Sequence, residues 1–512
     1  MVHVRDKHWA DETADEIFAT GKGPHEISTG ISPSGEIHIG NLREVITADV
    51  VHQVLKERGI EVTLDYVADN FDPLRKVYPF LDAAVYSSHI GKPLSEILCP
   101  CGGHSSYAAH FLEPFLSSLE RLRIHVKVYY ADQMYKSGML VPQIVQALRG
   151  RDAIARILHE CTGRKVEPEW SPFNPICGTC GRMTDTLVKG FSEKAATVDY
   201  TCSCGGRGTV SMKGGGKLTW RVDWPARWAR IPVTIEPFGK DHATRGGSYD
   251  TGALICREVF KAPPPFPVTY EWISFKGMGD MKKSKGNVLS VHRMLEVLPP
   301  EVLRYLIVKT QPMRAISFDP GLPLLSLMDE FDDAASQSRD PRALKLAGAD
   351  QFTPIGVPFR HLVNVVQMAD FDLDQVIVIL QRNKYPIPDP AEVKERAGYA
   401  IRWLREFAPD DLKFSVQRAL PPAARALDAA QRAFLSRLAG SLRPGMSGEE
   451  IHALIYEIAK EVGMEKTTAA FEAIYQAFLG QPKGPRAGWF LAFLEHDFVV
   501  ERLHEAGKAA AA

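Results

Sequence analysis

Two hydrophobic periods alternate in the first part of the chain. Apolar side chains recur at every second position in "GIEVTLDYVAD", which ends at Asp69, and again in "RIHVKVYYAD", a pattern typical of strands. Residues 42–55 instead place apolar side chains three and four positions apart, which indicates a helix. "HEISTG" before that helix, and "IPVTIEPFGKDH" and "FPVTYEWISFKG" later on, predict three further strands. Strands that alternate with helices favour an α/β fold around a mostly parallel sheet.

This alternation is interrupted over residues 89–218, where cysteines and glycines cluster. We interpret that range as an insertion between two halves of a Rossmann-like nucleotide-binding fold, at about 20–88 and 219–290, within a domain of residues 1–319. A connecting stem is predicted over 320–355, and residues 356–512 show one helical pattern after another, which predicts an all-α domain. Two apolar stripes are expected in its core: Ile451, Leu454, Ile455, Ile458 and Val462, and Phe471, Ile474, Tyr475 and Phe478.

The composition is that of an ordinary globular protein, with 45% of the 512 residues hydrophobic and 24% charged. A formal net charge of −1 excludes a generally polycationic nucleic-acid-binding protein, but not a local basic surface. Because the chain has no run of about 18 apolar residues, we expect no membrane span. We expect a cytoplasmic, monomeric protein whose eight cysteines are thiols or metal ligands. The N-terminal segment predicts an amphipathic helix that buries Trp9, Ala10, Ala14, Ile17 and Phe18.

The stretch "SPSGEIHIGN" joins the first predicted strand to the first predicted helix. Unpaired backbone N–H groups at a helix N-terminus attract phosphate, and Gly35 and Gly40 let the backbone approach a ligand closely. Pro33 stiffens the turn, His38 can donate to a phosphate oxygen, and Asn41 can hydrogen-bond a ligand or cap the helix. Strand, tight turn and helix in this order favour a nucleotide site over a structural turn with a surface histidine.

A second motif, "GDMKKSKGN", is cationic and flanked by glycine. Nucleotidyl transfer needs positive charge on a loop, because negative charge spreads over the phosphate oxygens and the leaving pyrophosphate. Lys283 and Lys285 are the candidate cations. Taken alone, such a motif is more typical of a solvated basic loop.

Together, "HIGN" and "KKSKGN" resemble the signature pair of the class I aminoacyl-tRNA synthetases, and the chain is similar to the class I lysyl-tRNA synthetases. The resemblance extends from Trp9 to Leu503 and includes "WADETAD", "DNFDPLRKVYP", "LTWRVDWPARWA", "EPFGKDH", "GSYDTG" and "GPRAGWFLAFLEHDFVVERL". The C-terminal stretch matters because the nucleotide motifs alone would leave other class I enzymes open.

The resemblance implies a lysine–tRNA ligase that serves translation. The lysine carboxylate would attack the α-phosphate of ATP, bound with Mg²⁺, to give lysyl-adenylate and pyrophosphate. The terminal adenosine of tRNA(Lys) would then accept the lysyl group. His38 and Asn41 would hold ATP, and Met281, Ser284 and Lys285 would close over it.

The second motif departs from the usual family pattern. Asp280 stands at the usual first lysine position, and Lys282 stands at a usual serine. Lys283 matches the second lysine of the general class I pattern, whereas Lys285 matches the lysine of a variant loop seen in many lysyl enzymes. The pattern therefore leaves open which of these two lysines contacts the pyrophosphate.

A bound lysine ammonium requires a paired carboxylate, because an isolated buried charge is very costly. Candidates should lie at the carboxyl ends of strands, where α/β proteins bind their ligands. The candidate carboxylates are Asp69, Asp72, Asp223 and Asp241. Four further residues are expected around the pocket: Gly30, Ser32, His242 and Trp220, the last as a wall for the aliphatic stem. Each of these residues taken singly is as typical of a structural or surface position.

The cysteines fall into two groups within the expected insertion. "CGTC" and "CSC" supply Cys177, Cys180, Cys202 and Cys204 at zinc-ribbon-like spacing, although the second pair is tighter than usual. We predict a structural zinc site there, with four reduced thiols as the alternative. "CPCGGH" offers Cys99, Cys101 and His104 with His110 nearby, as a second metal site or as histidines that serve substrate or tRNA.

The resemblance implies that the helical domain reads the anticodon. Five arginines along that domain, Arg418, Arg425, Arg432, Arg437 and Arg443, are candidate contacts, although the pattern is more typical of a solvated helix face. Two other function classes compete. A nucleotidyl transferase acting without tRNA is disfavoured by the long helical domain. A non-catalytic, zinc-bearing RNA-binding protein is disfavoured by His38, Asn41, Lys283 and Lys285.

Overall fold

The computed structural model describes residues 7–163, 165–276, 279–280 and 288–509. The chain divides into two compact units. The first comprises residues 1–295, 300–318 and 340–350, and the second comprises residues 296–299, 319–339 and 351–512. The range 320–355, expected as a connecting stem, is therefore divided between the two units.

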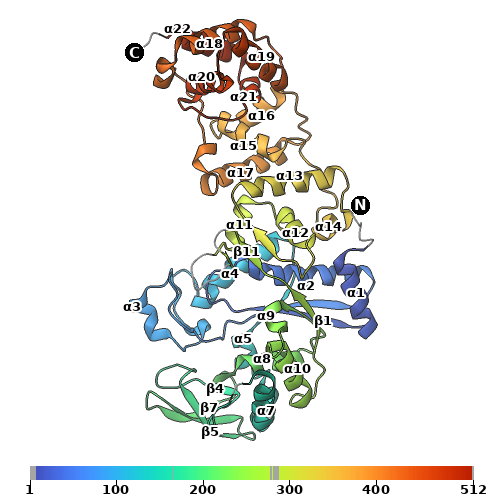
Figure 1. The fold of residues 1–512 in the computed structure, drawn as a ribbon. Helices are drawn as coiled ribbons and strands as arrows, with labels where there is room; N and C mark the ends of the chain where they lie inside the picture. The colour runs from blue at the N-terminus through green and yellow to red at the C-terminus, as the bar shows by residue number, and fades with distance from the viewer. Residues whose placement is uncertain (1–6, 164, 277–278, 281–287, 510–512) are drawn as a thin grey trace. The chain divides into compact units, whose positions relative to one another are not determined.

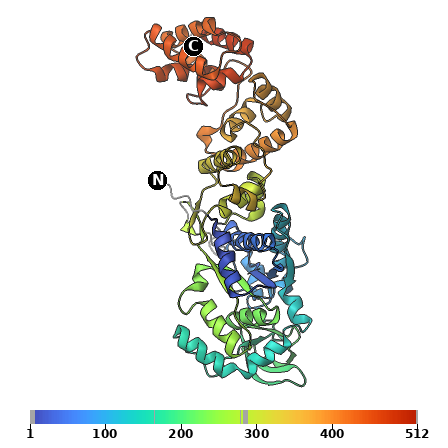
Figure 2. The ribbon, with the colours of Figure 1, turned by 90° about the vertical axis from the view of Figure 1, so that its right-hand side faces the viewer.

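The first unit contains strands and helices, whereas the second is drawn as helices (Figures 1 and 2). The first unit is built on a five-stranded parallel sheet with the strand order β10–β9–β1–β2–β3. Its strands are β1 (His25–Ile31), β2 (Val62–Ala68), β3 (Lys127–Tyr130), β9 (Ile235–Gly239) and β10 (Phe266–Tyr270). The α/β fold class and the parallel sheet predicted from the alternating periods are confirmed.

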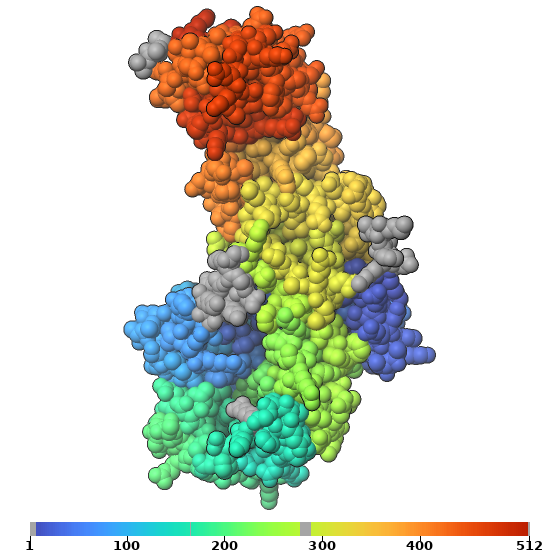
Figure 3. Space-filling view, in the orientation of Figure 1, coloured from blue at the N-terminus to red at the C-terminus, as the bar shows by residue number. Residues whose placement is uncertain are grey.

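The strand order contains a switch point between β1 and β9. The chain runs outward from β1 to β2 and β3, and then returns to the opposite side of β1 with β9 and β10. Connections therefore leave these two neighbouring strands in opposite directions, which opens a crevice at their carboxyl ends. In the space-filling view, green residues of the later part of this unit lie beside light-blue residues of its earlier part (Figure 3).

Helix α2 (Ile39–Glu57) follows β1 and packs against β1, β2 and β9. The side that faces the sheet is apolar, with Leu42, Val45 and Ile46 fully buried. Arg43 is also buried and donates to the carbonyl oxygens of Trp272, Pro312 and Arg314, among others. These bonds connect α2 to the small sheet of β11 (Ile273–Phe275), β12 (Gly279–Asp280) and β13 (Ile316–Phe318).

The predicted N-terminal amphipathic helix is α1 (Trp9–Thr20), which packs on α2. Trp9, Ala10, Ala14 and Ile17 are buried, and Trp9 Nε1 donates to the carbonyl oxygen of Val308 at 2.7 Å. The expectation that Phe18 also faces the core is wrong, because its side chain is 46% exposed. The buried stripe ends at Ile17, and Phe18 points about 100° further around the helix.

Residues 89–218, expected as one insertion, contain β3 of the main sheet. The inserted structure therefore falls on both sides of this four-residue strand, which lies within the stretch "RIHVKVYYAD" that was predicted as a strand. Helix α4 (Tyr107–Arg121) precedes it, and α5 (Ala131–Lys136), α6 (Val141–Arg149) and α7 (Arg151–Thr162) follow. Two small sheets come next: β4 (Phe173–Pro175) with β8 (Gly216–Leu218), and β5 (Thr186–Ser192), β6 (Thr197–Cys202) and β7 (Arg207–Ser211).

Helices α8 (Trp220–Arg230) and α10 (Ser248–Glu258) return the chain to the main sheet. Trp224, Trp228 and Ile255 from these helices share a buried cluster with Val67 of β2 and Phe238 of β9. The sheet is thus packed against helices through this cluster as well as through α2, which places the ends of β1 and β9 between layers.

The second unit is all helical in its described residues. It contains α13 (Leu322–Ser336), α15 (Phe359–Met368), α16 (Leu373–Arg382), α17 (Pro390–Glu406), α18 (Ala429–Ser441), α19 (Gly448–Glu461), α20 (Thr467–Leu479), α21 (Ala487–Phe493) and α22 (His496–Lys508). The two predicted stripes lie in its core on α19 and α20, with Leu454, Val462 and Phe471 only partly buried. In the described parts of the chain, every helix is too short or too polar to cross a membrane.

Candidate active site

Two cavities open where β1 and β9 end. The smaller, of about 250 Å³, has Trp220, Trp224 and Glu236 in its walls. The larger, of about 420 Å³, has His38 and Asn41 in its walls. They share four lining residues: Gly30, Ser32, Glu44 and His242. Neighbouring cavities with common walls suit two molecules that react with each other.

The first motif forms the wall of the larger cavity. His38 is the N-cap of α2, and its Nδ1 accepts a hydrogen bond from the Asn41 backbone N–H at 3.3 Å. The Asn41 side chain accepts in return from the His38 N–H at 3.4 Å, which completes a capping box. Gly40 is required by this packing, because a Cβ there would lie 2.9 Å from His38 Nδ1. The motif therefore shapes the helix end as well as the cavity.

The second motif lies largely outside the described residues. Met281, Lys283, Ser284 and Lys285 are not described. The segment that follows is connected directly to the first motif. Ile39 N–H donates to the Leu289 carbonyl oxygen at 3.3 Å, and Val291 N–H donates to the Ile37 carbonyl oxygen at 3.0 Å. The chain after the second motif thus runs beside the N-terminus of α2.

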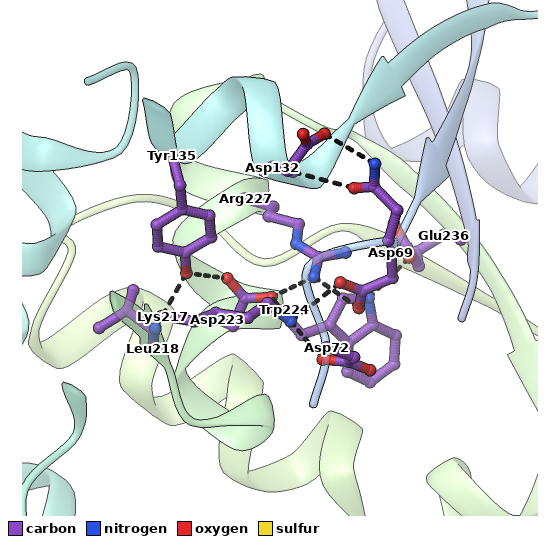
Figure 4. Close-up of polar contacts among 12 residues, drawn as sticks. Asp69, Asp72, Asp132, Tyr135, Lys217, Leu218, Asp223, Trp224, Arg227 and Glu236 are labelled. Atoms are coloured by element: carbon purple, nitrogen blue, oxygen red, sulfur yellow. Dashed lines mark hydrogen bonds and ion pairs between the residues drawn. The ribbon is translucent and has the colours of Figure 1, made fainter. Parts of the chain in front are cut away.

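Three of the predicted carboxylates form a buried ion-pair cluster (Figure 4). Lys217 Nζ lies 2.9 Å from Asp69 Oδ1 and also bonds Asp72. Arg227 Nη2 donates to Asp69 Oδ2 at 2.7 Å and bonds Asp223. Tyr135 donates to Asp223 as well. All three aspartates, the lysine and the arginine are buried.

This cluster balances most of its own charge. Burial alone would raise the pKa of Asp69, but Arg227 and Lys217 outweigh it and hold that pKa well below its usual range. Burial would lower the pKa of Lys217, yet Asp223, Asp69 and Asp72 raise it above its ordinary value. Three carboxylates face two cations, and the pKa of Asp72 is raised by burial and by Asp69. The predicted aspartates are therefore already engaged with cations of the chain itself.

Two other carboxylates in the smaller cavity have neutral partners, and sequence reasoning missed both. Glu44 accepts from the Gly30 N–H at 2.9 Å and from the Tyr270 hydroxyl at 2.8 Å. Glu236 accepts from Trp224 Nε1 at 2.7 Å. Burial raises the pKa of Glu44 to about 7 and raises that of Glu236 well above its ordinary value. A signal existed in the sequence for Glu236, because it is the only charged residue in the predicted strand "IPVTIEPFG".

Aromatic rings form one wall of the smaller cavity. Trp220 stacks on Trp224 with ring centroids 5.3 Å apart and an interplanar angle of 15°. His242 packs against both indoles, at 6.2 and 5.5 Å between centroids. Burial lowers the pKa of His242, which favours its neutral form. An apolar wall facing carboxylates suits a ligand with a long aliphatic stem and a cationic end.

The predicted site residues fall into three groups. The smaller cavity is lined by Gly30, Ser32, Asp69, Asp72, Trp220 and His242. His38, Gly40, Asn41 and Asp241 line the larger cavity. Pro33, Gly35 and Asp223 are buried and line neither of these two cavities, because the first two lie within the turn and Asp223 faces Tyr135 and Arg227.

The cysteine pairs of the insertion meet in space. Cys177 Sγ lies 3.6 Å from Cys204 Sγ, and Cys180 Sγ lies 3.7 Å from Cys202 Sγ. Ligand atoms bound to a tetrahedral zinc at 2.0–2.3 Å lie roughly 3.3–3.8 Å from one another. Gly206 keeps the space clear, because a Cβ there would lie 2.8 Å from Cys177 Sγ. The donor set and its spacing fit a zinc ion.

A second group joins two thiols and two imidazoles. Cys99 Sγ and Cys101 Sγ are 3.4 Å apart, and each lies 3.4 Å from His104 Nδ1. His110 Nδ1 completes the group at 3.6 Å from Cys99 and 3.3 Å from Cys101. Helix α4 brings His110 back to the cysteine loop. The sequence could place His110 only near this group, because that return depends on the fold. This set also has the spacing of a tetrahedral site.

A doubly wound parallel sheet, with a glycine-containing turn and a crevice at its switch point, defines a nucleotide-binding α/β protein. Residues 7–349 match the family described as tRNA synthetases class I (K). The chain belongs to this family.

Its relatives are similar over nearly their whole length. A lysine–tRNA ligase of Methanosarcina barkeri is 50% identical, over 98% of this chain and 97% of that protein. A lysine–tRNA ligase of Archaeoglobus fulgidus is 47% identical, over 98% of this chain and 100% of that protein. One from Methanocaldococcus jannaschii is 38% identical over 97% and 99% of the two chains.

Proposed function

We propose that this chain is a lysine–tRNA ligase that activates lysine with ATP and transfers it to the 3′-terminal adenosine of tRNA(Lys), as a cytoplasmic monomer. The observation that carries the proposal is the smaller cavity, which pairs a tryptophan wall with two carboxylates that have no cationic partner in their hydrogen bonds. Relatives that share 38–50% of their residues with it carry the same activity in their names.

ATP occupies the larger cavity in this proposal. The N-terminus of α2 presents backbone N–H groups and a positive dipole end to the phosphates. His38 and Asn41 line that cavity in a fixed orientation, because each holds the other in the capping box. Met281, Ser284 and the two candidate lysines, Lys283 and Lys285, would complete the site from the second motif, with Mg²⁺ accompanying the nucleotide.

Lysine occupies the smaller cavity, with its carboxylate toward the shared residues Gly30, Ser32 and His242. The lysine carboxylate would then lie at the boundary of the two cavities, where it can attack the α-phosphate of ATP. The stem lies along Trp220 and Trp224, and the ammonium meets Glu44 rather than the aspartates. Lys217 and Arg227 already pair with Asp69, Asp72 and Asp223 and balance most of their charge, so we assign these three to the support of the pocket.

Two structural zinc ions complete the proposed holoenzyme. Cys177, Cys180, Cys202 and Cys204 would hold one ion, and Cys99, Cys101, His104 and His110 would hold the other. The role of the first ion would be to close a small subdomain that buries little apolar surface.

The helical second unit is proposed to read the anticodon. Arg437 pairs with Glu461 at 3.5 Å, and Arg432 donates to the Leu427 carbonyl oxygen at 2.6 Å. Both are partly engaged within the unit, so Arg418, Arg425 and Arg443 are the better candidates for phosphate contacts.

Charging of bulk tRNA tests the proposal directly. The chain, ATP and Mg²⁺ are incubated with bulk tRNA and, in turn, lysine, arginine or glutamate. We expect ATP-dependent charging with lysine alone. Charging with arginine or glutamate instead would overturn the substrate assignment. Lysine-dependent pyrophosphate exchange without any charged tRNA would favour a nucleotidyl transferase.

A further inference from the structure

Tyr107, the first residue of helix α4, is bonded to the turn that carries the first motif. The side chain is fully buried, and its hydroxyl donates to the Ser34 carbonyl oxygen at 2.8 Å, across 73 residues of chain. Ser34 lies within the turn between β1 and α2. Ser32 and His38, on either side of it in that turn, line the larger cavity. The Tyr107 hydroxyl therefore holds the backbone from which two walls of this cavity extend.

The same helix carries part of the second group of metal ligands. We call this set the α4 group: Cys99, Cys101, His104 and His110. His104 precedes Tyr107 by three residues, and His110 follows it about one turn later on the helix. The Tyr107 N–H donates to the Ile97 carbonyl oxygen at 2.8 Å, which ties the start of α4 to the segment that enters the α4 group. A metal ion in this group would thus fix Tyr107 from both directions of the chain.

The part of the chain around the α4 group has a small core. Its buried apolar cluster has nine residues, and Tyr107 is one of them. Phe111 joins the ligands to this core, because its ring centroid lies 4.6 Å from that of His110 and 5.1 Å from that of Tyr107. A segment with so little apolar surface to bury gains much of its order from a bound metal. Order supplied by the metal therefore reaches Tyr107 through direct contacts.

We propose that metal binding by the α4 group fixes the nucleotide-binding turn through Tyr107, which makes Tyr107 a positioning residue for ATP. The inference rests on the proposed function, because ATP is the ligand assigned to the larger cavity. The hydroxyl acts on the Ser34 carbonyl oxygen and not on ATP itself. Its effect on the nucleotide comes from the backbone that places Ser32 and His38.

Tyr107→Phe removes the hydroxyl and keeps the buried ring. Lysine-dependent exchange of pyrophosphate into ATP, with tRNA present, gives the KM of each substrate. We expect the KM for ATP to rise about 3–10-fold, the range of one hydrogen bond, and the KM for lysine to change less than about twofold. Tyr86→Phe is the matched control, because Tyr86 belongs to the same cluster and donates to the Leu98 carbonyl oxygen at 3.1 Å. It should lower the thermal stability to a similar extent and leave both KM values unchanged.

The contribution of the metal is measured without activity. Hydrogen exchange of peptides that cover residues 32–42 reports on the turn and the start of α2, and atomic absorption counts the zinc ions. His110→Ala should lose one ion per chain and raise the exchange of these peptides. Tyr107→Phe should raise it with both ions retained. Cys180→Ser, in the other cysteine group, should also lose one ion but leave these peptides unchanged.

Unchanged KM for ATP and unchanged exchange in Tyr107→Phe would overturn the inference and leave the proposed function intact. Equal responses of the turn to His110→Ala and Cys180→Ser would also overturn it, because the effect would then be general destabilisation. A zinc content that His110→Ala leaves unchanged would do the same. If His110→Ala does not fold, removal of zinc from Cys180→Ser by a chelator replaces it. A wild-type chain without lysine-dependent pyrophosphate exchange would overturn the proposed function itself.

Discussion

Two groups of carboxylates lie at or beside the smaller cavity, and they differ in whether the chain supplies them with a cationic partner. Asp69, Asp72 and Asp223 receive Lys217 and Arg227 as permanent partners. Glu44 and Glu236 receive hydrogen bonds only from neutral donors within the described residues. In the first group, two cations of the chain balance most of the charge, whereas the second group has no cationic hydrogen-bond partner among the described residues. A buried carboxylate whose counter-charge is absent from the chain indicates where a cationic ligand binds.

The largest effect on stability should come from removing one of the two cations of the buried ion-pair cluster. Lys217→Met leaves three buried aspartates with Arg227 alone, and should lower the free energy of unfolding of the first unit by about 3–5 kcal/mol. Denaturant unfolding followed by tryptophan fluorescence measures this. The control is Lys194→Met, an exposed lysine, which should change stability by less than about 0.5 kcal/mol. Equal effects of the two variants would show that the cluster does not depend on the charge of Lys217.

Removing a charge from the second group should affect lysine rather than stability. Glu44→Gln should weaken lysine binding by about 10–100-fold, the range of one charge-assisted hydrogen bond. Its unfolding free energy should not fall, because glutamine carries no charge to bury. Glu36→Gln, an exposed glutamate in the neighbouring turn, should change neither property. A Glu44→Gln enzyme with unchanged lysine affinity would remove Glu44 from the site.

The two groups should respond to pH with opposite signs. The pKa of Asp69 is lowered in the folded state, so its stabilising contribution is present at neutral pH and is lost only in acid. The pKa of Glu44 is raised from 4.5 to about 7, so its folded form is favoured in acid and loses stability as pH rises through that window. The difference in unfolding free energy between Glu44→Gln and wild type should thus rise with pH, by at most about 1.4 kcal/mol per unit.

Urea unfolding between about pH 2 and 8 measures that difference and also covers the range in which Asp69 titrates. Asp69→Asn should diverge from wild type in the reverse direction, with its deficit shrinking below about pH 4 as the wild-type aspartate becomes protonated. Curves for both variants that run parallel to wild type would show that neither pKa is shifted.

The smallest expected effects come from two matched tyrosines. Tyr135 donates to Asp223, and Tyr270 donates to Glu44. Loss of one such donor costs about 1–2 kcal/mol. Tyr135→Phe should lower stability and leave the lysine affinity unchanged, whereas Tyr270→Phe should lower the lysine affinity several-fold with less effect on stability. Thermal unfolding and lysine titration of both variants test whether the two groups are separate.

The sequence was informative wherever a property depends on neighbouring residues. The period of apolar positions predicted β1, α2 and β2, and "HIGN" predicted a turn that enters a helix. Cysteine spacing predicted a group of four thiols, and the thiols do come together. Phe18 shows the limit of this local reasoning, since its exposure depends on what packs beside the helix, and the bounds expected for one insertion enclosed β3 of the main sheet.

The sequence could not show which carboxylates lie near the ligand without a cationic partner. Four aspartates were expected near the ligand because they follow strands or tryptophans in the sequence. Lys217 was not expected at all, because it reaches Asp69 and Asp72 across 148 and 145 residues of chain. Glu44 stands within an amphipathic helix, where a carboxylate is an ordinary surface residue until the helix end meets the neighbouring strands.

The sequence by itself thus determined the α/β order, the turn that enters α2, the group of four cysteines and the family. Those features depend on residues a few positions apart, or on resemblance along the whole chain. Only the tertiary structure decided which carboxylates are neutralised and which lack a cation. That distinction depends on the distance between charges that are remote in sequence, and on burial, which makes an absent counter-charge expensive.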